Sequence, residues 1–517
     1  MTICNGTHTI QDAFMNINKT TITSILWLLT IIIGLMPLFA NATAPIVKVG
    51  SKNFTESVIL GEMVVQLAKH TDIAATHRRE LGATAVVWKA LLRGDIDIYP
   101  DYTGTLFRET LARQGLRTLA DLRRRLKEMN IEITKPLGFN NTYAFGMKRT
   151  FAEKHNIKNI SDLNQHPQLR LGFSDSFMAR KDGWPNLRRV YKLPHTDVRG
   201  LNHDLTYQGL EKNAIDLTDT YSTDAEIAYY DLRILKDDLE YFPRYNAIFL
   251  YRSDLVNKAP YLVKALHKLE GNISESEMIQ MNMQAKINKI SESQVAADFL
   301  AQKLNIHVTV KQRSLWYKLY KLTLEHLFLV SISLFAAISI AIPLGIAAYK
   351  YSQLGQVILG IIGLIQTIPS LAILVFMIPL LGIGNAPAIA ALFLYSLLPI
   401  VRNTYTGLHD IAPELQESAE ALGLDPYAKM FLIELPLASR AIFAGIKTSA
   451  IINIGTATLG ALIGAGGYGQ PILTGIRLDD MGIILQGAIP AAVLALLVQF
   501  LFELSEKVIV PKGLQIK

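Results

Sequence analysis

Apolar and polar residues are distributed unevenly along this chain of 517 residues. Charged residues are dense and apolar runs are short in residues 45–306. Nearer the C-terminus, four stretches contain no Asp, Glu, Lys or Arg: 327–349, 351–401, 448–476 and 481–502. Ionised side chains are costly in lipid, and a helix needs about 20 apolar residues to cross it. The pattern therefore predicts a water-exposed domain followed by an all-α transmembrane domain in residues 322–517.

A separate apolar stretch, 22–39, precedes the water-exposed part. It follows Lys19 and ends before the small residues of 40–44, which is the layout of a signal peptide with its cleavage site. It is also nearly long enough to remain as a membrane anchor. The sequence leaves open whether residues 1–44 are cleaved, but both alternatives place residues 45–306 outside the cytoplasm.

Counting crossings from that external domain predicts the membrane topology. After a linker at 307–321, five spans, at about 322–349, 354–381, 386–402, 441–466 and 482–505, put the polar loop 411–437 in the cytoplasm. The positive-inside rule agrees for six basic residues that fall inside: Lys350, Arg402, Arg440, Lys507, Lys512 and Lys517. Four others fall outside and oppose it: Lys311, Arg313, Lys318 and Lys321. Because the second span contains Pro369 and Pro379, the sequence leaves open that it consists of two short helices, which would give six spans instead of five.

The external part contains an internal repeat. Five residues recur in type and spacing: Ile96, Asp97, Ile98, Tyr102 and Thr103, then Ile215, Asp216, Leu217, Tyr221 and Ser222. Each copy follows a helical pattern and enters an apolar run, which predicts a helix, a strand and a loop with a tyrosine. We therefore expect two α/β lobes. Ligands bind beyond the carboxyl ends of strands in such sheets, so Lys52, Tyr102, Arg180 and Tyr221 should face one cleft.

The polar loop reads ELQESAEALGLDPYAKMFLIELP at 414–436. It resembles the coupling loop of ABC-transporter permeases through Glu417, Ala419, Gly423 and Pro436, with Ser418 in place of the usual first alanine. The resemblance implies a cytoplasmic helix-turn-helix that docks on a separate ATPase subunit, and a permease that works as a homodimer in the lipid of a bacterial inner membrane.

Six motifs in residues 46–300 carry a second resemblance: SKNFTESVILGEM, DIDIYPDYTGT, PLGFNNTYA, FMARKDGWP, IDLTDTYSTD and FPRYNA. In this order they are similar to extracytoplasmic (periplasmic) proteins that bind glycine betaine, carnitine, choline and related osmoprotectants. The resemblance implies the type II two-lobed binding-protein fold. It also implies a tyrosine cage and a group of carboxylate-binding residues: Tyr102, Tyr143, Tyr221 and Tyr245 with Asn141, and Lys52, Thr105 and Arg180. Ergothioneine binders share these motifs, so the head group is better specified than the rest of the ligand.

The chemistry of a quaternary ammonium explains these residue types. It has no N–H to donate, so aromatic faces must attract it, at about 0.5 to 2 kcal/mol per ring. A carboxylate removed from water must be paired, and a guanidinium, an ammonium and a hydroxyl supply charge-assisted hydrogen bonds.

Signatures of enzymes are missing from the sequence. Neither a phosphate-binding G-x-x-x-x-G-K-[ST] loop nor an HExxH motif is present, and the one cysteine, Cys4, excludes thiolate metal sites. We expect no cofactor, no metal and no nucleic-acid partner, with ATP hydrolysed by another chain. The prediction is the substrate-binding and permease subunit of an ATP-driven importer. A ligand-gated receptor or channel with a similar clamshell is the alternative, although such a protein needs no coupling loop. The sequence does not decide which betaine is preferred, or whether uptake is osmotic or nutritional.

Overall fold

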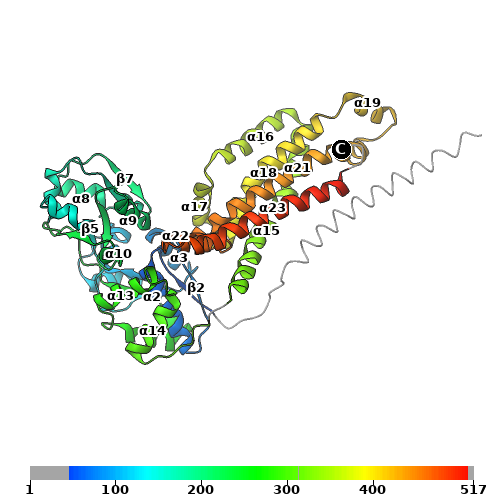
Figure 1. The fold of residues 1–517 in the computed structure, drawn as a ribbon. Helices are drawn as coiled ribbons and strands as arrows, with labels where there is room; N and C mark the ends of the chain where they lie inside the picture. The colour runs from blue at the N-terminus through cyan, green and yellow to red at the C-terminus, as the bar shows by residue number, and fades with distance from the viewer. Residues whose placement is uncertain (1–45, 312–313, 511–517) are drawn as a thin grey trace, which may run out of the picture.

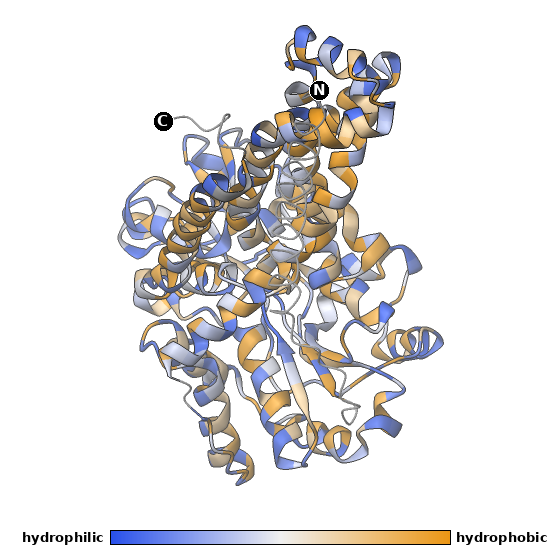
Figure 2. Ribbon diagram, turned by 90° about the vertical axis from the view of Figure 1, so that its right-hand side faces the viewer, coloured by the Kyte–Doolittle hydropathy of each residue, from blue (hydrophilic) through white to orange (hydrophobic). Residues whose placement is uncertain are grey.

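The computed structural model describes residues 46–311 and 314–510, so the N-terminal apolar segment, Arg313, Lys512 and Lys517 lie outside the described residues. A two-lobed α/β domain occupies one end of the molecule and a bundle of long helices the other (Figure 1). Hydrophobic residues predominate along these long helices, whereas hydrophobic and hydrophilic residues are intermixed in the α/β domain (Figure 2). The division follows the hydropathy of the sequence.

The first lobe is a five-stranded sheet in the order β2-β1-β3-β10-β4. Its strands are β1 Val47–Gly50, β2 Ala75–Arg78, β3 Ile98–Tyr102, β4 Ile131–Ile133 and β10 Ala247–Arg252. β1 is parallel to β2 and β3, whereas β10 runs antiparallel to β3 and β4. The main helices of this lobe are α2 Thr55–His70, α3 Thr84–Arg93, α5 Leu119–Glu128, α12 Pro260–Leu266, α13 Glu275–Lys286 and α14 Glu292–Leu304. The chain thus returns to the first lobe after building the second.

The second lobe contains two small sheets. One has the order β8-β5-β9 (Thr218–Tyr221, Tyr143–Lys148, Leu232–Leu235), and the other pairs β6 Leu171–Ser174 with β7 Val198–Leu201. Its helices are α6 Arg149–Lys154, α7 Asp175–Ala179, α8 Trp184–Tyr191, α9 His203–Glu211 and α10 Glu226–Tyr229. An Asn140–Asn246 bridge lies where the chain crosses between the lobes. The two-lobed α/β fold is confirmed, and the repeat is seen as α3 before β3 and α9 before β8.

The membrane part contains four helices long and apolar enough to cross a membrane, and a fifth such span if a bent pair counts as one. The single helices are α15 Leu315–Lys350, α18 Asn385–His409, α21 Leu435–Thr456 and α23 Met481–Ile509. The pair is α16 Ser352–Thr367 and α17 Ser370–Leu381, bent by 98° at the Pro369 break. α15 begins at Leu315, inside the stretch that the sequence assigns to a linker, and its first turns continue into the span without a break.

The two ends of the bent pair lie at opposite ends of the bundle, as expected for a pair that forms one crossing. At its start, the neighbouring Tyr349 lies next to the loop 411–437 through a 3.4 Å hydrogen bond from its hydroxyl to Glu434. At its end, the Arg93 guanidinium of the external domain donates to the carbonyls of Ile378 and Pro379, both at 2.9 Å. These contacts support the predicted total of five crossings.

Small and polar residues hold the bundle together where α15, α18 and α21 cross. Asn453 donates to the hydroxyls of Ser396 at 2.8 Å and Ser333 at 3.2 Å, and all three side chains are fully buried. A Cβ added at Gly345 would lie 2.5 Å from Thr404, so glycine permits the close approach of α15 and α18. Interhelical hydrogen bonds and small residues are the usual means of helix association in lipid.

Labelling of single cysteines should show that the loop 411–437 and the α/β domain lie on opposite sides of the membrane. In a Cys4→Ser background, Tyr261→Cys (71% exposed in the native residue) should react with an impermeant maleimide in right-side-out vesicles. Leu422→Cys (79% exposed) should react only after permeabilisation. Labelling of Leu422→Cys in sealed vesicles would contradict the five-crossing topology.

Candidate functional site

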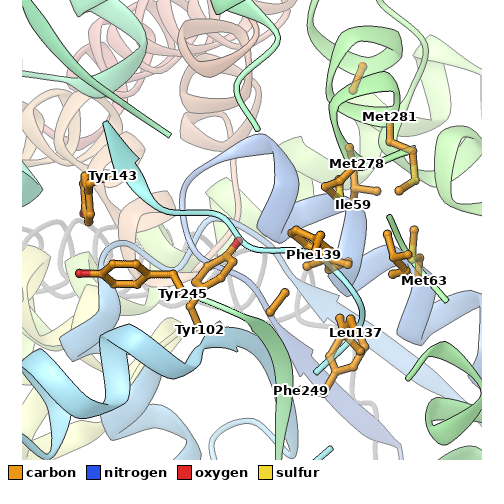
Figure 3. Close-up of a cluster of buried hydrophobic side chains, with 14 of the residues drawn as sticks. Ile59, Met63, Tyr102, Leu137, Phe139, Tyr143, Tyr245, Phe249, Met278 and Met281 are labelled. Atoms are coloured by element: carbon orange, nitrogen blue, oxygen red, sulfur yellow. The ribbon is translucent and has the colours of Figure 1, made fainter. Parts of the chain in front are cut away.

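All eight residues predicted to bind the ligand line one cavity of about 250 Å³ between the two lobes. They are Lys52, Tyr102, Thr105, Asn141, Tyr143, Arg180, Tyr221 and Tyr245. Figure 3 shows Tyr102, Tyr143 and Tyr245 beside one another at the edge of an apolar cluster that continues through Phe139 and Ile59. The cavity is therefore open to the cleft on one side and supported by the main core on the other.

Strand ends position the tyrosines. Tyr102 and Tyr221 are the last residues of β3 and β8, as the repeat predicts. Tyr143 begins β5, where it pairs with Tyr221, and Tyr245 comes two residues before Ala247 of β10, which pairs with Tyr102. Because these pairs are antiparallel, the start of one strand lies beside the end of its neighbour. This pairing brings the four tyrosines to one edge.

The rings enclose the cavity from several directions. Tyr143 lies 5.1 Å from Tyr221 and 5.8 Å from Tyr245 between centroids, at 61° and 80°. Phe54, which the sequence analysis did not select, bridges the two lobes at 5.5 Å from Tyr221 and 6.2 Å from Tyr102. Phe54 lies in the SKNFTES motif, two residues after the predicted ligand residue Lys52, and this proximity in the sequence could have identified it as a cavity residue.

The cage phenols are neutral at physiological pH. A phenol with its ordinary pKa near 10 is already protonated there. Burial raises the pKa of Tyr143 further, to about 12, and it raises the pKa of Tyr102, Tyr221 and Tyr245 above the usual value. Attraction of a cation by these rings therefore depends on their quadrupoles, without phenolate charge.

The outer face of Tyr221 is occupied by the imidazole of His203. The two rings stack with centroids 4.4 Å apart and an interplanar angle of 29°. Burial lowers the pKa of His203, but the carboxylates of Asp224 and Asp219 outweigh it and raise this pKa to about 9. Tyr221 thus already has a cation on one face, and its other side is left for the cavity.

Both cations of the cavity already have carboxylate partners. Lys52 Nζ lies 2.5 Å from Asp101 Oδ1. Arg180 forms a two-pronged pair with Asp182 through Nε at 2.8 Å and Nη2 at 2.6 Å, and its Nη1 lies 2.6 Å from Glu109. A lysine has three N–H donors and an arginine five, so each keeps donors that a ligand carboxylate can use.

A buried carboxylate, Glu56, lies behind the cage. Its Oε1 accepts hydrogen bonds from the Tyr102 hydroxyl at 2.5 Å and the Asn141 amide at 2.9 Å. Its Oε2 accepts from the Thr223 hydroxyl at 2.5 Å and the Asn282 amide at 3.3 Å. Thr223 belongs to the second lobe and the other partners to the first lobe or the crossing between them. Glu56 therefore fixes two predicted ligand residues and joins the lobes.

The predicted coupling residues gather at the far end of the bundle, around α19 Pro413–Ala421 and α20 Pro426–Lys429 (Figure 1). Ala419 is buried, Glu417 is exposed, and Pro436 lies in the first turn of α21. Gly423 ends α19 with φ +76°, and its N–H donates to the Glu420 carbonyl at 2.9 Å. The loop is a helix-turn-helix, and a glycine makes the turn.

Comparisons with known proteins match both halves of the chain. The family described as the substrate-binding domain of ABC-type glycine betaine transport systems matches residues 45–302. The family described as the inner membrane component of binding-protein-dependent transport systems matches residues 337–512.

Three similar proteins illustrate these matches. The glycine betaine/carnitine/choline transport system permease protein OpuCB of Bacillus subtilis is 45% identical over 197 residues, which are 38% of this chain and 90% of that protein. The ergothioneine transport permease/ergothioneine binding protein EgtU of Helicobacter pylori is 34% identical over 279 residues, 53% of this chain and 50% of that protein. A crystal structure of a glycine betaine/carnitine/choline ABC transporter covers 50% of this chain and 98% of its own, with 32% identity and a TM-score of 0.43.

The affinity of the cavity for a trimethylammonium head group should rise with pH through neutrality. Burial raises the pKa of Glu56 to about 7 in the empty cleft, and a cation against Tyr102 stabilises the ionised form. A cation held near this carboxylate lowers that pKa by on the order of one unit, so binding of tetramethylammonium should tighten about five- to tenfold from pH 5.5 to 8. Calorimetry on the full-length protein measures this change.

Glu56→Gln is the control for that measurement. The pKa of Glu109, which also lines the cavity, is raised by burial, so a second group contributes to any pH dependence. Glu56→Gln should remove most of the dependence and leave the part that belongs to Glu109. An unchanged pH profile in this variant would show that Glu56 does not act on the ligand.

Proposed function

We infer the ligand and partners of this protein from its place in the family of osmoprotectant ABC importers, to which it belongs as a fused substrate-binding and permease subunit. The binding domain is extracytoplasmic and the permease domain spans the inner membrane. We propose that the cavity between the lobes holds a quaternary-ammonium solute such as glycine betaine, carnitine or choline, with residues 45–306 forming the binding domain and 322–517 the permease.

The observation that carries this proposal is the group of neutral, buried tyrosines that line a small cavity. Tyr102, Tyr143 and Tyr245 are each less than 10% exposed, so a cation bound there is shielded from water. Cation–π attraction is stronger in a desolvated site. A trimethylammonium group combines one positive charge with an apolar surface, and these rings suit both properties. Asn141, tied to Glu56, completes this end of the cavity.

A second group of cavity-lining residues is proposed to receive a carboxylate. Lys52, Thr105 and Arg180 are all less than 10% exposed, and all three line the cavity. Since Lys52 and Arg180 retain donors after pairing with their own carboxylates, they can bind a zwitterion without an unpaired charge remaining when the cleft is empty. Ergothioneine, another trimethylated zwitterion, is the second candidate because of the similarity to EgtU.

The loop 411–437 is proposed to dock on a separate ATPase subunit. Its helices leave five large apolar side chains exposed: Leu415, Leu422, Tyr427, Phe431 and Leu432. Exposed apolar residues in one patch favour a protein partner. A ligand-gated receptor or channel needs no such patch. α23 likewise exposes Leu496, Leu497 and Phe500 in a single chain, which supports contact with lipid and with a second permease copy in a homodimer.

Calorimetry on the full-length protein in detergent tests the ligand assignment directly. Glycine betaine, carnitine, choline and ergothioneine are titrated in turn, followed by uptake of any ligand that binds in cells that express the ATPase subunit. Binding and ATP-dependent uptake of at least one compound are expected. Failure of all four to bind would contradict the cage.

Arg180→Ala and Tyr221→Ala should separate the two ends of the ligand. Truncating one partner of a buried charge pair typically costs about 2 to 5 kcal/mol, so Arg180→Ala should weaken glycine betaine by roughly 30-fold or more. The same change leaves Asp182 and Glu109 without their cation, so choline should bind as well as before or tighter. Tyr221→Ala should weaken both ligands by a similar, smaller factor. Equal losses of both ligands in Arg180→Ala would contradict carboxylate binding by this arginine.

Gly423→Val should uncouple transport from ATP hydrolysis without affecting ligand binding. A β-branched residue at φ +76° is strongly disfavoured, yet no atom lies within 4 Å of the added Cβ, so the effect comes from the turn itself. We expect ligand affinity within about twofold of wild type and at least a tenfold loss of ligand-stimulated ATPase activity. Gly115→Val is the matched control, because Gly115 has φ +64° and equally open surroundings but lies in the binding domain. Normal stimulation in Gly423→Val would show that this turn is not needed for coupling.

A further inference from the structure

The end of α22 (Gly469–Arg477) connects the permease to the binding domain through a buried arginine. Arg477 is 3% exposed. Its guanidinium donates from Nε to Glu80 at 2.6 Å, from Nη1 to the Thr55 hydroxyl at 3.0 Å, and from Nη2 to Glu292. In Figure 1 the label of α22 lies at the junction of the two domains, beside α3. One permease side chain thus holds three groups of the first lobe.

The three partners come from separate parts of that lobe. Glu80 follows β2, Thr55 is the first residue of α2, and Glu292 is the first residue of α14. Thr474, almost one turn before Arg477, donates to both oxygens of Glu80 at 3.0 and 3.2 Å. Two carboxylates and a guanidinium buried together depend strongly on one another. Loss of the Arg477 cation would leave Glu80 without its ion-pair partner and Glu292 with Arg79 alone, at 3.6 Å. The contact is therefore specific and fixed in position.

The same partners are next to the ligand cavity in the chain. Thr55 stands between Phe54, a wall of the cavity, and Glu56, which holds Tyr102. The N–H of Glu80 donates to the Ser51 hydroxyl at 3.3 Å, and Ser51 precedes Lys52. Thr55, which accepts a hydrogen bond from Arg477, is thus one residue away from Phe54 on one side and from Glu56 on the other.

Two residues beyond Arg477, the same segment touches the second lobe. The amide of Gln208 on α9 donates to the Asp479 carboxylate at 2.7 Å, and this contact is exposed. Lys289, in the first lobe, donates to the carbonyls of Leu478 and Asp479. The segment 477–479 therefore contacts one lobe through a buried ion pair and the other through a single exposed hydrogen bond.

We propose that Arg477 and Asp479 form the point at which the permease detects whether the two lobes have closed on a ligand. Arg477 anchors the first lobe to α22. The contact of Asp479 with Gln208 depends on the position of the second lobe, because hinge closure moves one lobe relative to the other. This inference depends on the proposed function in one respect only, namely that a ligand bound in the cavity causes the two lobes to close.

The anchor is tested without any ligand by hydrogen exchange on the full-length protein. Arg477→Gln should increase amide exchange in residues 76–82 and 469–478 at least threefold. Arg93→Gln is the matched control, since Arg93 also crosses the junction, but it bonds to carbonyls of α17 and pairs with Asp95 of its own lobe at 3.6 Å, so it joins no carboxylate to the permease. Unchanged exchange in Arg477→Gln, or an equal increase in Arg93→Gln, would overturn the anchor role.

Detection of closure is tested with glycine betaine as the probe. Arg477→Gln should bind glycine betaine with an affinity within about threefold of that of the wild type. Its uptake in cells that express the ATPase subunit should nevertheless fall at least tenfold. Arg93→Gln should retain uptake. A parallel loss of binding and uptake would mean that Arg477 only supports the fold. Wild-type protein that binds no glycine betaine contradicts the proposed ligand, and the exchange measurement still decides the anchor.

A cross-link provides a measurement in which Arg477 is intact. Gln208→Cys and Asp479→Cys are combined in a Cys4→Ser background and treated with a short thiol cross-linker, with and without glycine betaine. Cross-linking should rise at least threefold with the ligand. The same yield in both conditions would show that this contact does not report closure.

Discussion

Removal of an ionised side chain from water costs several kcal/mol unless a partner compensates it, and the two halves of the protein meet this constraint differently. The membrane spans avoid ionised residues over long stretches. The binding domain buries them in bonded groups, such as Lys52 with Asp101 and Arg180 with Asp182. Arg477 lies at the junction, where a membrane protein must reach into an aqueous domain, and there the charge is again paired on several sides.

The ligand cavity follows the same constraint. Its cations are neutralised by neighbouring carboxylates and its tyrosines are neutral, so the cavity lining buries little uncompensated charge. Burial raises the pKa of Glu56 to about 7, and the four hydrogen-bond donors around it, none of which is a cation, only partly offset this effect. A bound trimethylammonium group would supply part of the missing positive charge through the Tyr102 ring. We expect ligand recognition and proton release to be linked mainly through Glu56, with a smaller contribution from Glu109.

Fusion of the two domains changes how they meet. Only the stretch 307–314 separates the binding domain from α15, so the domain stays next to the permease at a high effective concentration. An interface under those conditions need not be large or tight to be occupied. It must instead respond to the state of the cleft, and a buried anchor on one lobe with a weak contact on the other has this property.

The sequence by itself determined the features that depend on local or repeated patterns. Charge-free stretches indicate which part of the chain forms the long apolar helices. The helix-strand-tyrosine repeat places Tyr102 and Tyr221 at strand ends. The motif around Gly423 predicts a turn, and the structure has one there. The eight predicted cavity residues follow from resemblance of short motifs, and the tertiary structure brings all of them to one cavity.

Tertiary structure alone decided which groups lie across from one another. The antiparallel entry of β5 and β10 brings Tyr143 and Tyr245 to the same edge, although each begins or precedes its strand. Glu56 and its partner Thr223 are 167 positions apart, and Thr55 and Arg477 are 422 apart. No local pattern encodes such pairs, because a buried charge selects its partner by position in space after the chain has folded.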